Sequence, residues 1–186
     1  MRIPFNVALA ILLSYGLCAS ADSPAGAGAS EKPKDYRFTS GQSALNIPFD
    51  EDDGHIDLKV RINHSDPCRF GLDTGAIRSV VDTRTAQRLG LRIEGSQRVG
   101  GAGGAEEAGI IKHLALQLPG AELLDQTAWA LPLNSLASLA SSSAPTTKGR
   151  ELAGILSYAL FSHFVVEIDY AAKLIMYSSR FLGILA

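Results

Sequence analysis

The chain has 186 residues, of which 46% are hydrophobic and 19% are charged, and its formal net charge at pH 7 is -2. This length and composition allow one compact domain with a real core, and they exclude a chain that is disordered throughout or spans a membrane many times. The charge balance and the absence of any block of basic residues argue against nucleic acid as a partner.

Residues 1–21 are predicted to be a signal peptide. Arg2 supplies a short positive region, Val7 to Leu17 form an apolar run, and Ala19-Ser20-Ala21 has the small-residue pattern of a cleavage site. We therefore expect a periplasmic or secreted protein whose mature chain starts at Asp22. If the segment were not cleaved, it would instead act as a membrane anchor.

Residues 22–40 are rich in Pro, Gly, Ala and Ser and show no apolar period, which predicts a flexible linker or arm. The folded domain is accordingly expected to span residues 41–186. Cleavage after residue 21 removes Cys18 and leaves Cys68 as the only cysteine, so no intramolecular disulfide is expected. Cys68 is predicted to be a small buried hydrophobic side chain beside Phe70.

From Ala44 onward the chain has the pattern of short strands separated by turns. In residues 55–62 the apolar side chains alternate strictly, which places Ile56, Leu58, Val60 and Ile62 on one face of a strand. A helix is expected over residues 83–90, with Asp82 or Thr83 as its N-cap and Gly90 as its stop. The other strands predicted in this half are 44–49, 68–73 and 79–82, with a solvated turn at Glu51 to Asp53.

Residues 99–118 predict a long hairpin, because strand-forming residues flank the glycine-rich stretch Gly100-Gly101-Ala102-Gly103-Gly104. Further strands are expected at 127–133, where Trp129 is assigned to the core, and at 151–156, 164–170 and 173–177. Short helices are expected at 134–140 and 157–163, and an exposed loop at 141–150. The fold class predicted from this order is all-β, a small closed barrel with one or two short helices.

One short segment carries a carboxylate at an unusual place. In "FGLDTGAIRSVV", Asp73 follows an apolar strand, and Thr74, Gly75 and Ala76 form a turn before the strand pattern resumes. A buried carboxylate is costly unless it is paired or hydrogen-bonded, so this turn is a candidate functional site. The structural alternative is a turn aspartate that accepts a hydrogen bond from its own backbone.

The chain resembles the single-domain, retropepsin-like aspartic proteases. The resemblance rests on "LDTGAIRSVVD", on the glycine-rich hairpin and on "LAGILSYALFSHFVVEIDYAAKLIMY", and it covers most of residues 44–177. It implies an acid-protease-like barrel in which Asp73 is the catalytic carboxylate and Thr74, Gly75 and Ala76 build the loop that holds it. Gly154 would support this loop from a second loop. The resemblance also implies a flap over an extended polypeptide substrate, formed by Gly100, Gly101, Ala102, Gly103 and Gly104.

This chemistry needs two facing carboxylates that share one proton. The chain contains one Asp-Thr-Gly and no internal repeat, so the second carboxylate must come from another copy, which implies a homodimer. No cofactor and no metal are expected. The leading hypothesis is an exported aspartic endopeptidase, a hydrolase. One rival is a catalytically silent domain of the same fold that binds peptides or a partner protein, and a weaker one is an envelope protein whose arm is the working part.

Two positions depart from the family pattern. Ser157 stands where the family often has a second glycine, and the predicted flap has no aromatic residue near its tip. Other chemistries lack support in the sequence: it contains no G-x-S-x-G, no H-E-x-x-H and no phosphate-loop lysine after the glycine-rich stretch. The four histidines lie far apart in the sequence and are expected not to bind metal; they are His55, His64, His113 and His163.

Overall fold

The computed structural model describes residues 35–52, 54–101, 104–133 and 151–179. The chain divides into two units, Met1–Lys32 and Pro33–Ala186, and all the described residues lie in the second. The predicted signal peptide, the predicted helix at 134–140 and the predicted loop at 141–150 lie outside the described residues. Within the described part of the chain, no helix is long and apolar enough to cross a membrane.

Short strands make up most of the described unit. The first half contains β1 (Tyr36–Phe38), β2 (Ser43–Pro48), β3 (Asp50–Asp52), β4 (His55–Ile62), β5 (Cys68–Leu72), β6 (Val80–Asp82) and the helix α1 (Thr83–Arg88). The second half contains β7 (Ser96–Gly101), β8 (Gly104–Leu118), β9 (Ala121–Leu131), β10 (Gly154–Leu156), the helix α3 (Tyr158–His163), β11 (Phe164–Asp169) and β12 (Leu174–Ser179). The predicted all-β class with short helices is confirmed.

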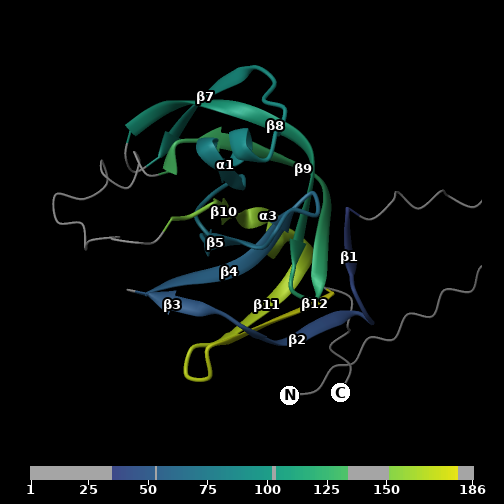
Figure 1. Cartoon of the computed structure of the whole chain (residues 1–186). Helices are drawn as coiled ribbons and strands as arrows, with labels where there is room; N and C mark the ends of the chain where they lie inside the picture. The colour runs from purple at the N-terminus through teal and green to yellow at the C-terminus, as the bar shows by residue number, and fades with distance from the viewer. Residues whose placement is uncertain (1–34, 53, 102–103, 134–150, 180–186) are drawn as a thin grey trace, which may run out of the picture. The chain divides into compact units, whose positions relative to one another are not determined.

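Nine strands form one sheet, in the order β1-β9-β6-β10-β5-β4-β8-β7, with β3 paired to β4. Because β8 also pairs with β9, this sheet curls back on itself and partly closes into a barrel (Figure 1). A second sheet contains β11, β12 and β2 in that order. Figure 1 shows the β7–β8 hairpin at the top of the unit and the three-stranded sheet at the bottom.

The alternation in β4 explains how one face of the sheet becomes core. Ile56, Leu58, Val60 and Ile62 are each at most 5% exposed, as the period-two pattern predicted. They belong to one large cluster that also contains residues from β5, β8, β9, β10, α3 and β12. Burial of this apolar face is the main favourable term in folding such a domain.

Helix α1 begins after Asp82, which is one of the two N-cap candidates predicted from the sequence. The buried Asp82 carboxylate accepts hydrogen bonds from the backbone N–H groups of Arg84 and Thr85 through Oδ1 and from that of Leu133 through Oδ2. Asp82 is therefore the N-cap, and its three bonds satisfy a carboxylate that is 1% exposed. The helix ends at Arg88, and Gly90 follows with a φ of 62°.

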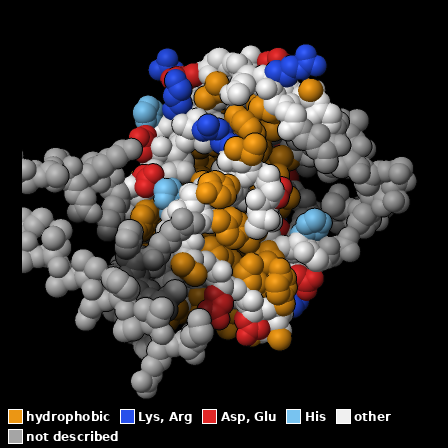
Figure 2. Space-filling view, turned by 180° about the vertical axis from the view of Figure 1, so that it is seen from behind, with side chains coloured by type: hydrophobic (Ala, Val, Ile, Leu, Met, Phe, Trp, Pro, Cys, Tyr) orange, Lys and Arg blue, Asp and Glu red, His pale blue; other side chains and the backbone are white. Residues whose placement is uncertain are grey.

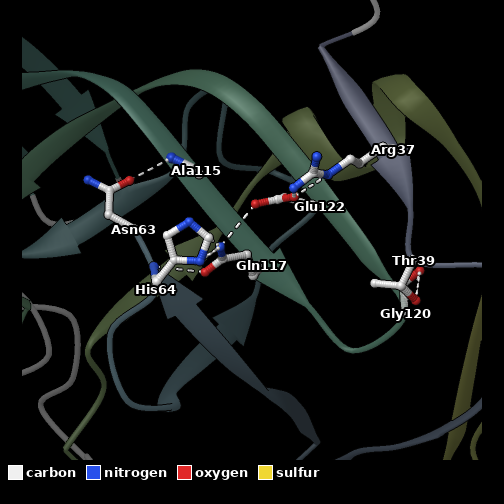
Figure 3. A network of polar contacts seen from close by, with 8 residues as sticks. All are labelled: Arg37, Thr39, Asn63, His64, Ala115, Gln117, Gly120 and Glu122. Atoms are coloured by element: carbon white, nitrogen blue, oxygen red, sulfur yellow. Dashed lines mark hydrogen bonds and ion pairs between the residues drawn. The ribbon is translucent and has the colours of Figure 1, made fainter.

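Strand β1 lies inside the stretch 22–40, which the sequence analysis assigned to a flexible arm. It pairs antiparallel with β9, and the Arg37 guanidinium lies 2.5 Å from the buried Glu122 carboxylate (Figure 3). Gln117 donates a second hydrogen bond to Glu122 at 3.0 Å. The rings of Tyr36 and Phe38 each lie 5.1 Å from the ring of Phe164. A three-residue strand is too short to show a period, so these distant partners decide its structure.

Two side chains assigned to the core are only half-buried. The Cys68 thiol donates to the carbonyl oxygen of Val60 at 3.2 Å, and burial raises the pKa of this thiol above its ordinary value. The ring of Trp129 lies 5.8 Å from the Arg78 guanidinium, which also donates to the carbonyl oxygen of Thr127. Hydrophobic side chains reach the surface elsewhere too, and Figure 2 shows many of them gathered in a band on one face.

Candidate functional site

Asp73 lies directly after β5 and is exposed. Strand β10 runs parallel to β5, with Gly154 beside Phe70 and Leu156 beside Leu72. The backbone N–H of Asp73 extends this pairing by donating to the carbonyl oxygen of Leu156 at 2.9 Å. The sheet itself therefore fixes the backbone from which the carboxylate projects.

The Asp73 loop, residues 73–76, is tight and is braced at its far end. Oδ1 of Asp73 accepts a hydrogen bond from the backbone N–H of Gly75 at 2.8 Å. The carbonyl oxygen of Ala76 accepts from the backbone N–H of Tyr158, at the start of α3, at 3.0 Å. Thr74 is exposed, and its hydroxyl has no hydrogen-bond partner among the described residues.

The hydrogen bond from the Gly75 N–H is the bond predicted by the structural alternative, in which Asp73 is a turn aspartate that accepts from its own backbone. It occupies Oδ1 of Asp73, and no contact within the described part of the chain occupies Oδ2. A Cβ at position 75 would lie 3.3 Å from Oδ1, closer than most Cβ atoms come to a neighbour, so glycine suits this approach. The turn thus holds the carboxylate by one oxygen and leaves the other exposed.

A buried pair of hydroxyls joins the segment after the loop to the start of α3. The side-chain oxygens of Ser79 and Ser157 lie 3.0 Å apart, and both residues are at most 2% exposed. Ser157 also caps α3 by accepting the backbone N–H of Ala159. In the sequence, Ser157 stands out only as a departure from glycine, and the pair leaves no local signal because 78 positions separate the two serines.

Gly154 holds the strand arrangement together through its lack of a side chain. It lies in β10, paired with Phe70 of β5 on one side and with Val81 of β6 on the other. A Cβ at this position would meet the ring of Phe70 and would lie 2.5 Å from the carbonyl oxygen of Val80. Gly154 is thus placed in the strand whose Leu156 carbonyl binds Asp73, two residues further on.

The β7–β8 hairpin carries the glycine-rich stretch. Gly100 pairs with Ala105 and Gly101 pairs with Gly104, while the predicted flap residues Ala102 and Gly103 lie outside the described residues. The base of the hairpin is fixed by a second apolar cluster, in which residues of β7 and β8 pack with residues of β6 and β9 and with Leu133. Its buried members are Val80, Val99, Ala108, Leu131 and Leu133. The hairpin is therefore anchored on the strand that directly follows the Asp73 segment.

The other carboxylates of the described residues were compared with Asp73 as possible partners. No contact among the described residues joins Asp73 to a second carboxylate. Asp82 is buried and serves as a helix cap, and Asp169 accepts the backbone N–H of Ala172 at a turn. In the part of the chain that the structure describes, no group of three or more His, Cys, Asp or Glu side chains could hold a metal ion.

Comparison with known proteins adds two findings to this geometry. A family model described as aspartyl protease matches residues 58–159, a stretch that contains the Asp73 loop, the hairpin and Gly154. A solved structure of a retropepsin-like aspartic protease from Rickettsia conorii is similar, with a TM-score of 0.48 and 19% sequence identity over 74% of this chain and 92% of that one. No curated protein matches the sequence.

Proposed function

The chain belongs to the aspartyl protease family, and on that premise we propose that it is an endopeptidase whose active site forms from two copies of Asp73 across a homodimer. The observation that carries this proposal is the Asp73 loop. An exposed carboxylate is fixed through its own backbone and through one oxygen, while its second oxygen has no contact among the described residues. The single Asp-Thr-Gly in the sequence supports a second copy as the source of the other carboxylate.

In this mechanism the two Asp73 carboxylates share one proton, because two like charges a few ångströms apart cannot both ionise cheaply. The ionised carboxylate takes a proton from water, and the resulting hydroxide oxygen attacks the carbonyl carbon of the peptide bond. The protonated carboxylate donates to the carbonyl oxygen, which gives a tetrahedral diol. The carboxyl group that took the proton from water then protonates the amine nitrogen as the C–N bond breaks, and the other carboxylate takes back a proton from a hydroxyl of the diol, which restores the shared proton. The free Thr74 hydroxyl would hydrogen-bond the loop of the other copy.

The hairpin supports a polypeptide as the substrate. It packs against β6 and β9, and its paired residues Gly100, Gly101 and Gly104 have no side chains that would exclude an extended chain. An extended peptide in such a place would bind through main-chain hydrogen bonds. We expect this hydrolase to work without cofactor or metal. We also expect it to act in the periplasm or outside the cell, because residues 1–21 have the pattern of a signal peptide.

The test is cleavage of an unfolded protein by the purified chain at pH values from acid to neutral. Asp73→Asn is compared with Asp66→Asn, which alters another exposed aspartate at the opposite end of β5. We expect cleavage by the wild-type chain and by Asp66→Asn. The Asp73→Asn variant should be slower by roughly 10²–10⁴-fold, because it cannot supply a shared proton.

Two outcomes contradict the proposal. If Asp73→Asn cleaves as fast as the wild-type chain, then Asp73 is not the catalytic carboxylate. If the folded wild-type chain cleaves nothing at any pH, the chain is a silent domain, and binding of peptides to it becomes the function to measure.

A further inference from the structure

A cavity of about 540 Å³ lies at the end of β5 that is remote from the Asp73 loop. One face of α1, the turn before β5, the first residues of β5 and the segment before β10 line it, and no residue of the Asp73 loop does. This volume is within the range of cavities that bind small molecules. We call it the β5 cavity.

A buried hydroxyl without a partner lines this cavity. Thr85 is 3% exposed and reaches the cavity from α1. Its hydroxyl has no hydrogen-bond partner among the described residues, yet it is not sealed in the core as the Tyr177 hydroxyl is. A polar group that is withdrawn from bulk water is costly unless it is hydrogen-bonded. The Thr85 hydroxyl is therefore a group that a ligand in the cavity can satisfy.

Charged side chains of both signs line the β5 cavity, and three of them have no charged partner within the described part of the chain. Arg88 reaches the cavity from the last turn of α1, and its guanidinium forms no ion pair with a described residue. Asp66 and Glu151 line it from the turn before β5 and from the segment before β10, and neither carboxylate forms such a pair. Arg69, the fourth charged lining residue, instead lies 3.7 Å from the Asp57 carboxylate. One cation and two carboxylates are thus available to a ligand.

The Arg88 guanidinium and the Thr85 hydroxyl come from the same face of α1. Residues three apart on a helix are neighbours, with Cβ atoms about 5–6 Å apart. Burial raises the pKa of the Cys68 thiol, which also lines the cavity, and the positive charge of Arg88 opposes this rise. The charge of Arg88 therefore acts inside the cavity. A hydroxyl and a guanidinium that adjoin in this way can donate to the two oxygens of one carboxylate.

The charges around the cavity select a ligand that carries both signs. A simple anion would be attracted by Arg88 and repelled by Asp66 and Glu151, and a simple cation would meet the reverse. Helix α1 supplies the cation, whereas the two carboxylates come from other segments, so the opposite charges of the ligand must bind different walls. The ammonium and carboxylate groups of a single amino acid share one carbon atom, whereas those of a peptide are further apart. The arrangement therefore favours a short peptide.

We propose that the β5 cavity binds a short peptide, with its C-terminal carboxylate on Arg88 and Thr85 and its N-terminal ammonium group on Asp66 and Glu151. Such a ligand satisfies the Thr85 hydroxyl and pairs the three available charges at once, which a simple ion cannot do. The site is independent of the proposed function, because no residue of the Asp73 loop takes part in it.

The experiment is a titration of the purified full chain with alanylalanine, followed through the NMR signals of the backbone amides. We expect the signals of residues 65–69, 85–89 and 151–153 to shift. Acetate and methylammonium each carry one of the two charges and should bind at least about tenfold more weakly, as should glycine. If acetate binds as tightly as alanylalanine, the cavity is an anion site and the proposal is wrong. If only residues 73–76 shift, the peptide binds at the proposed active site, which contradicts this inference and leaves the proposed function standing. A chain that binds alanylalanine in the cavity but cleaves nothing supports this inference and contradicts the proposed function.

Variants on the cavity walls test the groups one by one. Arg88→Gln and Glu151→Gln should each weaken alanylalanine binding about tenfold or more. The matched control is Arg84→Gln, which alters an exposed arginine of α1 that does not line the cavity and should leave binding unchanged. Thr85→Val should weaken binding without lowering the free energy of unfolding in urea, because the hydroxyl that it removes has no partner among the described residues. If Arg88→Gln binds as tightly as the wild-type chain, or if Thr85→Val loses stability and keeps its binding, the proposal is wrong.

Discussion

Replacement of Gly154 by alanine tests the strand arrangement that positions Asp73. Strand β10 lies between β5 and β6, and a methyl group at position 154 would collide with the ring of Phe70 and with the carbonyl oxygen of Val80. Phe70 is fully buried in the main core, and the Val80 oxygen belongs to the backbone of β6. Neither group can move without disturbing its own neighbours.

The expected loss follows from these contacts. Inserting a methylene into a well-packed core costs about 1–3 kcal/mol. Alanine lowers the conformational entropy of the unfolded chain relative to glycine. This raises the free energy of unfolding by about 0.4–1 kcal/mol, but only where the native backbone conformation is free of strain. Because one collision at position 154 involves a backbone oxygen, we expect the free energy of unfolding to fall by about 3 kcal/mol. This lowers the ratio of folded to unfolded chain on the order of a hundredfold.

Urea unfolding of Gly154→Ala measures this loss, with Gly100→Ala as the control. A Cβ at position 100 would have no atom within 4 Å, so the control should change stability by less than about 0.5 kcal/mol. Adding Phe70→Leu removes the ring contact, and we expect a coupling of at least about 1 kcal/mol between the two changes. If Gly154→Ala unfolds at the same urea concentration as the wild-type chain, the close approach of β10 to β5 and β6 is wrong.

Two further predictions concern buried hydroxyls. The Tyr177 hydroxyl is buried without a hydrogen-bond partner among the described residues, and burial raises its pKa above the ordinary tyrosine value. The contribution of the neutral Tyr177 hydroxyl to the free energy of unfolding is therefore fully present below the unfolded tyrosine pKa of about 10. It is lost progressively as the pH rises above that value. Tyr177→Phe should reduce the alkaline loss of stability in thermal unfolding from pH 7 to 11, to which the partly buried Cys68 thiol also contributes; an unchanged loss contradicts the assignment. Ser79→Ala leaves the buried Ser157 hydroxyl with only its bond from the Ala159 N–H. Ser157→Ala leaves the Ser79 hydroxyl unpaired and removes the cap of α3, so each variant should cost about 1–3 kcal/mol in urea unfolding. The double variant should cost less than the sum of the two, and strict additivity would count against the pair.

Much of the fold could be predicted from local pattern. The strict alternation in residues 55–62 predicted the buried face of β4, and Asp82 predicted the start of α1. These signals are local because a strand repeats every two residues and a helix cap acts within one turn. Local pattern predicted a strand only from residue 127, and this was wrong: β9 begins at Ala121, after Gly120 with a φ of 80°. The Pro119-Gly120 pair is the turn signal that marks this earlier start.

Short-range residue pattern predicted that Asp73 lies in a tight turn after an apolar strand, and that one chain carries one such carboxylate. It also indicated the family, which the match over residues 58–159 confirms. These conclusions depend on residue types at fixed short spacings, and a turn or a strand is specified by residues that are neighbours in the chain.

The surroundings of Asp73 depend on contacts between distant segments, which only the folded chain brings together. The bond from Asp73 to Leu156, the hydroxyl pair of Ser79 and Ser157, and the pairing of Gly154 with both β5 and β6 each join segments more than 70 positions apart. Such contacts leave no period in the sequence, because they arise when the sheet closes and places distant strands side by side.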